Sequence, residues 1–525
     1  MVHTSMWLCV ACSIFMVAVF WEGGLPVLRS GDDYLASLRD GRQVYVGGQI
    51  VEDVTCHPGF AGAARTVARL FDVTASDPSL RYIEPETGEQ TNVNFLRPRS
   101  GDDLATRRRL HVAWAGVSNG LFGRSPDHVA AMVTGMACRP EVTGSERFSE
   151  NLVNYWRYIR DNDLYLSFAV LPPAGSKSGK STGVQNAMRV VGTDRDGVTV
   201  RGFKMLATGG PLCDEILVGN AQPLRPSDVA VAVSFAIPAN HPGVRILARK
   251  PYAAHAVSRI DDPLADFDEA DSAIYFDNVQ IPWERVFVLD DPQASYGLFV
   301  ETPAHTLGNA QAHIRLLVKM RFILAAAKRL GDALDFTGNP AVQGVFGGLA
   351  ARVKMLEAAV VAQEAHPESW PNGYVSQDRQ FMYATSNWSM EYFPEFANEM
   401  RKLLASHAFQ QPADVSAFED DYTKSLFLEL NRTEDFESAM GRYRLIRLMW
   451  DLVGSELASR NNQYELFYAG PPHVTRTRVW DYFDWRAAEA PVQEFLTRTG
   501  PASSPDGVAP ARALGGGDAI LGDRT

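Results

Sequence analysis

The sequence predicts an α+β protein built in three parts: an N-terminal helical domain, a middle antiparallel β-barrel domain and a C-terminal four-helix bundle. The spacing of apolar residues changes twice along the chain. It follows the period of an α-helix over 58–162, alternates with a period of two over 164–290, and becomes helical again after about residue 303. We expect the following divisions: an apolar extension 1–30, domains 31–162, 163–295 and 296–498, and a disordered tail 499–525.

Composition and charge exclude several classes of protein. The chain has 525 residues, more than one hydrophobic core usually supports, and 46% of them are hydrophobic and 21% charged, as in soluble enzymes. The net charge of −12 argues against a nucleic-acid partner. Five cysteines are present, and no His/Cys cluster has the spacing of a metal site, so we expect a cytoplasmic protein without a metal.

Residues 6–21 are almost entirely apolar. No Lys or Arg precedes them, and they are fewer than the ~20 residues that a membrane span needs. We interpret them as an upstream extension or a disordered tail, with a signal peptide as the alternative.

In the N-terminal part, the segment from Gly123 to His128 predicts a loop that delivers an arginine and then begins a helix. Ser125 is a favoured N-cap, Pro126 suits the first helical position, and Asp127 complements the helix dipole. The arginine of this loop therefore lies at a helix N-terminus, where backbone N–H groups favour an anion. The alternative is an ordinary capped helix with a surface arginine. Helices are expected over 34–42, 58–71, 101–121, 126–138 and 143–162, with a hairpin over 43–51.

The middle part contains short runs with a period of two, separated by Pro and Gly clusters, and several such runs predict a barrel or sandwich. Asp194 to Gly197 supplies a hairpin turn between two of them. Residues 175–181 imitate a phosphate-binding loop but have too few residues between their glycines, so we interpret them as a connector. Strands are expected over 164–171, 187–192, 198–206, 215–219, 229–237, 244–248 and 273–281.

The C-terminal part carries four long amphipathic patterns, which predict a four-helix bundle. Pro394 lies within the third and predicts a kink there. The patterns cover approximately residues 314–325, 349–360, 377–408 and 434–459.

Several segments resemble those of one flavoprotein superfamily, in a consistent order over about residues 31–495. The three-part layout and residues 276–286 are similar to the acyl-CoA dehydrogenase-like flavoproteins. A closer resemblance is to the oxygenase components of two-component, flavin-dependent phenol hydroxylases, typified by 4-hydroxyphenylacetate 3-monooxygenase. The segments that carry it are 34–41, His57-Pro58, 123–127, Asn151 with Tyr155 and Ile159, Ala207-Thr208, 448–456, Arg460 and Tyr464-Glu465.

This resemblance implies an FADH2-dependent aromatic monooxygenase. A separate NAD(P)H:flavin reductase would supply the FADH2, and its reaction with O2 would give a C4a-hydroperoxide that hydroxylates a phenol ortho to its hydroxyl. Such chemistry needs a site shielded from water and a phenol held in one orientation. The expected substrate is a tyrosine-like or other 4-substituted phenol of secondary metabolism, free or attached to a carrier protein. The expected assembly is a homotetramer.

By the same resemblance, Arg124 is the substrate-contacting arginine. The hydroxyphenylacetate enzymes have a tyrosine after the Pro-Asp pair and a histidine on the first β strand, where this chain has His128 and Phe168. We predict that His128 replaces the missing histidine as the partner of the phenol and that the helix N-terminus keeps it neutral. A capping or packing histidine is the alternative. The predicted catalytic residues are Arg124, His128 and His305, and the predicted substrate-binding residues are Arg124, His128, Phe168, Asn220 and Ala221.

Three segments are implied to bind the flavin: the first β strand, the turn after a later strand, and the region after the fourth bundle helix. For the turn 207–210, a plain strand end is the alternative. The predicted cofactor-binding residues are Phe168, Ala169, Val170, Leu171, Thr208, Gly210, Tyr464, Glu465, Leu466 and Phe467.

Other functions on the same fold stay open. An acyl-CoA dehydrogenase needs a catalytic glutamate in the bundle, for which Glu357 and Glu456 are available. A lyase similar to 4-hydroxybutyryl-CoA dehydratase needs cysteines for an iron–sulfur cluster, and this chain has none after Cys213. A scaffold protein with a degraded site is the non-enzymatic alternative.

Overall fold

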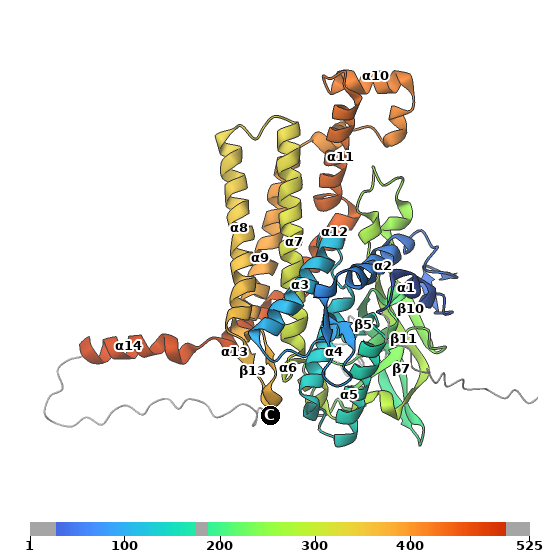
Figure 1. Cartoon of the computed structure of the whole chain (residues 1–525), viewed down its shortest axis with the longest axis vertical. Coiled ribbons are helices and arrows are strands. Elements are labelled where there is room, and N and C mark those ends of the chain that lie inside the picture. The colour runs from blue at the N-terminus through green and yellow to red at the C-terminus, as the bar shows by residue number, and fades with distance from the viewer. Residues whose placement is uncertain (1–27, 174–186, 500–525) are drawn as a thin grey trace, which may run out of the picture.

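The computed structural model describes residues 28–173 and 187–499. It confirms the predicted fold class: N-terminal helices, a two-sheet β region and a C-terminal helical bundle lie against one another (Figure 1). Predictions about residues 1–27, the connector at 175–181 and the tail from 500 fall outside these ranges. Within the described ranges, no helix is both long and apolar enough to cross a membrane.

The described chain begins with an ion pair inside the predicted extension. Arg29 donates to both carboxylate oxygens of Asp214, at 2.6 and 2.8 Å, and Ser30 caps the first helix.

The helices of the N-terminal part are α1 Gly31–Ser37, α2 Ala61–Ser76, α3 Gly101–Val117, α4 Pro126–Cys138 and α5 Glu146–Asp161, with a small hairpin of β3 Arg81–Ile83 and β4 Gln90–Asn92.

Helix α4 has the bounds that the sequence predicts, and every one of its residues is buried. It packs on α5, on the strand β5 (Leu166–Ala169) and on the long helix α7 (Ala304–Ala333). Most of its residues are apolar, and its polar residues Asp127 and His128 are hydrogen-bonded inside the protein, so the whole helix can be buried. The loop that carries Arg124 therefore ends at a rigid, buried element.

The strands form two sheets. The larger has the order β2-β1-β10-β11-β7-β6 and the smaller the order β12-β9-β8-β5. Pairs β1–β10 and β5–β8 are parallel, and the other pairs in these sheets are antiparallel. The bounds are β1 Val44–Val46, β2 Gln49–Val51, β5 Leu166–Ala169, β6 Arg189–Thr193, β7 Gly197–Thr208, β8 Glu215–Val218, β9 Val233–Pro238, β10 Val244–Ala248, β11 Asp271–Pro282 and β12 Val286–Leu289.

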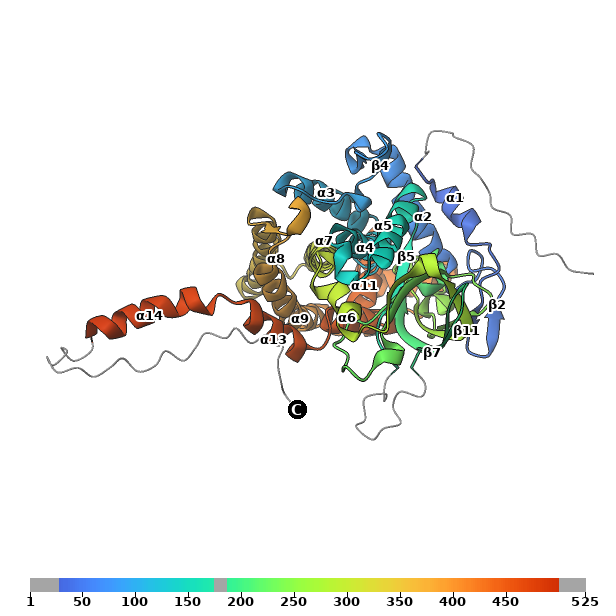
Figure 2. The ribbon, with the colours of Figure 1, turned by 90° about the horizontal axis from the view of Figure 1, so that it is seen from below.

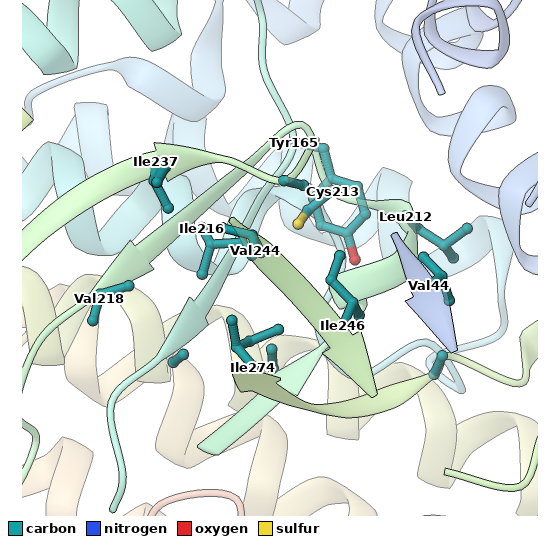
Figure 3. Packing of buried hydrophobic residues seen from close by; sticks show 14 of the residues in the cluster. Val44, Tyr165, Leu212, Cys213, Ile216, Val218, Ile237, Val244, Ile246 and Ile274 are labelled. Carbon is teal, nitrogen blue, oxygen red and sulfur yellow. The ribbon is translucent and has the colours of Figure 1, made fainter. Parts of the chain in front are cut away.

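The two sheets share one apolar core. Leu171, just after β5, forms a bridge with Met205 of β7 and so joins the smaller sheet to the larger. Burial of the aliphatic side chains between the two sheets fixes how the sheets lie relative to each other. It thereby also fixes the positions of the strand ends that border the cavity described below. Figure 3 shows part of this core and labels Val44, Tyr165, Leu212, Cys213, Ile216, Val218, Ile237, Val244, Ile246 and Ile274.

The bundle consists of α7, α8 (Pro340–Ala365), α9 (Arg379–Leu404) and α11 (Phe436–Val453), which share an apolar core. Helix α9 continues through Pro394. The fourth predicted helix ends earlier than expected, because Ser455 caps a new helix, α12 Glu456–Phe467. The remaining helices are α6 Pro292–Val300, α10 Asp421–Leu430, α13 Pro472–Tyr482 and α14 Trp485–Thr499.

Helix α14 projects away from the rest of the molecule in both views (Figures 1 and 2). All its residues are exposed, including Val492, Phe495 and Leu496. An isolated helix of this length is marginal in water.

Candidate active site

A cavity of about 1810 Å³ lies where the three parts of the chain meet. A site for one drug-sized ligand usually encloses about 300–1,000 Å³, so this cavity has room for more than one such ligand. Its walls come from the start of α4, the end of β5, strand β7, the first turns of α7, and helices α12 and α13. Lining residues include Arg124, His128, Phe168, Val170, Leu171, Lys204, Thr208, Asn220, Ala221, His305, Arg460, Tyr464, Phe467 and Arg478.

Arg124 and His128 form one polar unit in this cavity. Arg124 Nη1 lies 2.6 Å from His128 Nε2, and His128 Nδ1 lies 3.1 Å from the carbonyl oxygen of Gly308. Since the carbonyl can only accept, Nδ1 carries the proton and Nε2 accepts from Arg124. Burial, and then the adjacent guanidinium, lower the pKa of His128 well below its usual value. Both effects favour the neutral imidazole, with its lone pair directed at Arg124, and they are burial and a neighbouring charge, whereas the sequence analysis attributed the neutral form to the helix N-terminus.

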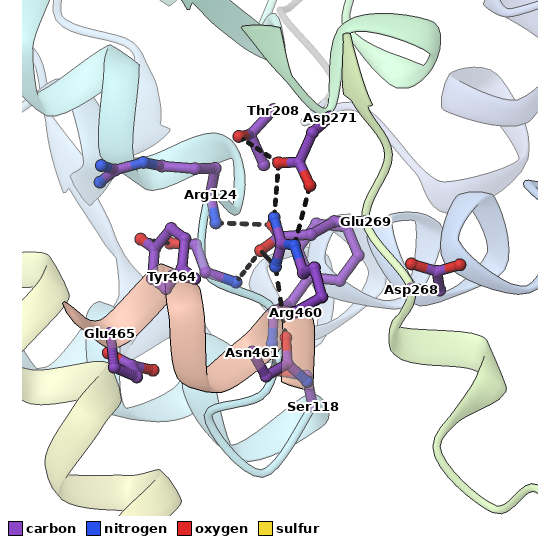
Figure 4. A network of polar contacts seen from close by, with 12 residues as sticks. Ser118, Arg124, Thr208, Asp268, Glu269, Asp271, Arg460, Asn461, Tyr464 and Glu465 are labelled. Carbon is purple, nitrogen blue, oxygen red and sulfur yellow. Dashed lines mark hydrogen bonds and ion pairs between the residues drawn. The ribbon is translucent and has the colours of Figure 1, made fainter. Parts of the chain in front are cut away.

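The backbone that carries Arg124 is held by a buried carboxylate. Glu269 accepts hydrogen bonds from the backbone N–H groups of Gly123 and Arg124, both at 2.8 Å, and from Arg460 Nη1 at 2.7 Å (Figure 4). Tyr165 Oη donates to the Arg124 carbonyl at 2.8 Å. The loop is thus held through its backbone, and the arginine side chain lines the cavity, where it donates to His128 and to the Tyr468 carbonyl.

Tyr165 can reach this loop only because residue 209 is glycine. Gly209 has a φ of 77°, and a Cβ at this position would lie 2.1 Å from Tyr165 Oη. Only glycine supplies both the left-handed conformation and the space.

Ser125 is at the N-cap position, as predicted, but its hydroxyl does not cap the helix. Ser125 Oγ donates to Asp127 Oδ1 at 2.5 Å and accepts from Gln311 at 3.1 Å. Asp127 is also paired with His111 Nδ1 at 2.9 Å. The cap residues therefore tie α4 to α3 and α7.

His305 faces the cavity from the first turn of α7. Its Nδ1 lies 3.0 Å from Tyr383 Oη, and Arg478 Nη1 of α13 donates to its Nε2 at 3.0 Å. Burial, followed by Arg478, lowers the pKa of His305 well below its usual value. The cavity thus contains a second arginine–imidazole pair, built like the first.

Strand alternation divides the predicted residues of the first β strand. Phe168, Val170 and Leu171 line the cavity, whereas Ala169 points into the core between the sheets. The ring of Phe168 lies 5.4 Å from the Arg124 guanidinium carbon and 5.7 Å from the ring of His128.

Thr208 lines the cavity and donates to Asp271 Oδ1 at 2.7 Å. Burial would raise the pKa of Asp271, but Arg460 and Arg249 hold it well below its usual range. Gly210 does not line the cavity: it packs against Ala207 and Ser272.

Helix α12 contributes one face to the cavity. Tyr464 and Phe467 line it, three residues apart, and the Tyr464 ring lies 5.2 Å from the Arg124 guanidinium carbon. Glu465 points the other way: Arg315 Nη1 and Nη2 donate to its two oxygens at 2.8 Å and Lys319 donates at 3.0 Å. Leu466 does not line the cavity either. A helix turns by about 100° per residue, and the side chains of Glu465 and Leu466 lie off the face that Tyr464 and Phe467 share.

The structure adds cationic residues that the sequence analysis missed as site residues. Lys204 and Arg478 line the cavity, and Arg460 reaches it from α12. Arg460 is one of the positions that carry the family resemblance. No local pattern marks Lys204, because Val198 and Val200, an even number of residues before it on the same strand, lie in the core. Among the described residues, no carboxylate lies within ion-pair distance of Arg124, Lys204 or Arg478. The cavity therefore suits a large ligand that carries negative charge.

No group of three or more His, Cys, Asp or Glu side chains in the described ranges is placed to hold a metal ion.

Comparison with known proteins identifies relatives over almost the whole described chain. Models of the N-terminal and C-terminal parts of 4-hydroxyphenylacetate 3-hydroxylase match residues 30–288 and 295–497. The 4-hydroxyphenylacetate 3-monooxygenase oxygenase component of Geobacillus sp. (strain PA-9) is 30% identical over 481 residues, covering 89% of this chain and 96% of the relative. A (3S)-3-amino-3-(3-chloro-4-hydroxyphenyl)propanoyl-[peptidyl-carrier protein] monooxygenase of Streptomyces globisporus is 30% identical over 464 residues, 86% of each chain.

Solved structures give the same result. A crystal structure of the oxygenase component of 4-hydroxyphenylacetate 3-monooxygenase, complexed with FAD and 4-hydroxyphenylacetate, superimposes with a TM-score of 0.83. Its sequence is 27% identical, and the alignment covers 90% of this chain and 98% of that one.

Proposed function

The chain belongs to the 4-hydroxyphenylacetate 3-hydroxylase family, and from this premise we propose that it is the oxygenase component of a two-component system that hydroxylates a phenol ortho to its hydroxyl group. In the balanced reaction, phenol, O2 and FADH2 give a catechol, water and FAD. The observation that carries the proposal is Arg124, held by its backbone beside the neutral His128 and facing a cavity with room for a cofactor and a substrate.

The residues present fit FAD. The cavity combines apolar walls with cations that have no described carboxylate partner, as an anionic dinucleotide with a flat ring requires. Phe168, Leu171, Thr208, Tyr464 and Phe467 are the residues that would hold it. When bound in reduced form, the flavin would supply the activation of O2 and one oxygen atom for the ring.

Arg124 is proposed to bind the phenol oxygen and to stabilise its anionic form, the better nucleophile. We propose that His128 acts in one of two ways: it accepts the phenol proton when Arg124 turns toward the ligand, or it aims Arg124. His305 with Arg478 would serve as the second polar pair, and Asn220 and Ala221 would lie on the substrate side.

The substrate is proposed to be a tyrosine-like or other 4-substituted phenol, free or attached to a carrier protein. A relative in Streptomyces globisporus acts on a carrier-bound β-tyrosine-type phenol by its name, which supports this class. The partner is a separate NAD(P)H:flavin reductase. A cytoplasmic location fits the described cysteines, Cys56, Cys138 and Cys213, which are all free thiols.

The experiment is a coupled assay with reductase-generated FADH2, 18O2 and a panel of phenols. We expect one labelled oxygen atom per catechol formed, and less H2O2 in the presence of the right phenol. His128→Ala should lower substrate affinity or increase H2O2. Complete conversion of FADH2 to H2O2 with every phenol would contradict an oxygenase and favour a scaffold protein or an acyl-CoA dehydrogenase-like flavoenzyme.

A homotetramer is also proposed, supported by the unpartnered helix α14. Deleting residues 485–525 should lower the oligomeric mass, because it removes the exposed Val492, Phe495 and Leu496 that a second copy would cover. Light scattering after size-exclusion chromatography gives the measurement. A matched variant, Arg486→Gln, should keep the wild-type mass, and an unchanged mass in the deletion variant would contradict a role for α14 in assembly.

A further inference from the structure

Lys204 is a buried amine on the wall of the cavity. It lies on strand β7, and Lys204, Leu206 and Thr208, each two residues apart on this strand, line the cavity. Only 3% of its surface is exposed.

The amine is held by an amide whose orientation is fixed. Lys204 Nζ donates to Asn220 Oδ1 at 2.6 Å. The amide nitrogen of Asn220 donates to the Val231 carbonyl at 3.0 Å and to Ser295 Oγ at 2.8 Å, so the oxygen must face the lysine. This arrangement places the amine at the cavity wall and leaves further N–H donors for a ligand.

No described carboxylate neutralises the charge of the protonated Lys204 amine. It forms no ion pair with a described residue, and among the described residues no charged group is found to act on its protonation; burial lowers the pKa of Lys204 to about 7. A buried ammonium without a counterion is unfavourable, and an anion brought into the cavity would supply the missing charge.

We propose that Lys204, aimed by Asn220, is an anion-binding residue of the cavity that takes an oxyanion of the bound ligand. The choice of ligand rests on the proposed function and leaves two sources of this oxyanion: the pyrophosphate of the flavin nucleotide and a carboxylate at the far end of the phenolic substrate. In either case the amine takes up a proton as the anion binds, because the anion favours its charged form.

The test measures proton uptake by calorimetry at pH 8 in two buffers of different ionisation enthalpy. With a pKa of about 7, about nine-tenths of the Lys204 amines are neutral at this pH, so binding of the anion should take up close to one proton. One arm compares FAD with riboflavin, which lacks the phosphates. The other compares 4-hydroxyphenylacetate with the neutral 4-hydroxyphenylethanol. Uptake confined to one charged ligand identifies the source.

Variants at position 204 test whether Lys204 is the group that takes up the proton when the anion binds. Lys204→Met should lose the uptake and bind the identified ligand at least 10-fold more weakly. Lys204→Arg, which cannot deprotonate, should bind without uptake. The matched control Lys250→Met removes a surface lysine paired with Glu456 and should behave as wild type.

Equal uptake in wild type and Lys204→Met, or no uptake with either charged ligand, would overturn the proposal. Thermal unfolding checks that the variants are folded. Because the readout is binding, it is independent of oxygen transfer: uptake without any hydroxylated product would contradict the proposed function and leave this inference intact.

Discussion

Replacing Glu465 with Gln is expected to destabilise the protein by about 3–5 kcal/mol, because it breaks a buried ion-pair network and leaves two cations without a counterion. Glu465, Arg315 and Lys319 are all fully buried between α12 and α7. Urea unfolding at pH 7 gives the measurement.

The stability lost in Glu465→Gln should depend on pH, because the Glu465 carboxylate becomes protonated at low pH. Burial would raise the pKa of Glu465, but Arg315 and Lys319 more than offset it and hold the pKa at about 2. A lowered folded-state pKa contributes stability above the unfolded value of about 4.5, and this contribution is lost as the pH falls toward 2. The difference between wild type and Glu465→Gln should therefore narrow over this range.

The matched control is Glu357→Gln. Glu357 also accepts from one arginine and one lysine, Arg321 and Lys354, but on the exposed surface of the bundle. Solvent screens such exposed ion pairs, so the urea midpoint of Glu357→Gln should be almost the same as that of wild type. Equal midpoint shifts for the two variants would show that burial does not determine how much the Glu465 network stabilises the folded protein.

Replacing Arg124 with Met is expected to lower kcat/KM for coupled hydroxylation about 100-fold, as the loss of one preorganised cationic donor does. The fold of the loop should survive, because Glu269 and Tyr165 hold its backbone. The share of FADH2 that ends as H2O2 should rise, since a misplaced phenol accepts no oxygen. Product and H2O2 are measured in the same assay.

Arg124→Lys should recover only part of the loss, because lysine keeps the charge but not the fork that reaches both His128 and the Tyr468 carbonyl. Arg195→Gln, on the exposed hairpin, is the matched control and should be neutral. An unchanged product yield in Arg124→Met would remove this arginine from substrate binding.

Local patterns predict most elements of this fold. Helix α4 follows from its cap residues, and the hairpin between β6 and β7 follows from residues 194–197. The pairing of Val44 with Ile246 does not follow, because partners about 200 residues apart leave no local signal. It places β1, which the sequence assigns to the helical part, within the larger sheet.

The candidate site could be predicted segment by segment, but not side chain by side chain. Ala169, Gly210, Glu465 and Leu466 lie in the expected segments and do not line the cavity. The alternation of β5 would have separated Ala169 from Phe168, and the helical period of α12 would have separated Glu465 and Leu466 from Tyr464 and Phe467. The pairing of His305 with Arg478 joins residues 173 apart in the chain and could not be predicted from the sequence, whereas Arg124 and His128 are only four residues apart.

Helix α12 has a consequence for the timing of synthesis. Arg460 and Tyr464 complete the cavity wall beside Arg124. More than four-fifths of the chain precedes these two residues in the sequence. A ribosome-bound chain can form its N-terminal helices and both sheets long before these residues emerge. The nascent protein therefore passes through a stage in which the cavity is open on this side. A chain truncated before α12 would be an incomplete oxygenase, unable to enclose a reduced flavin.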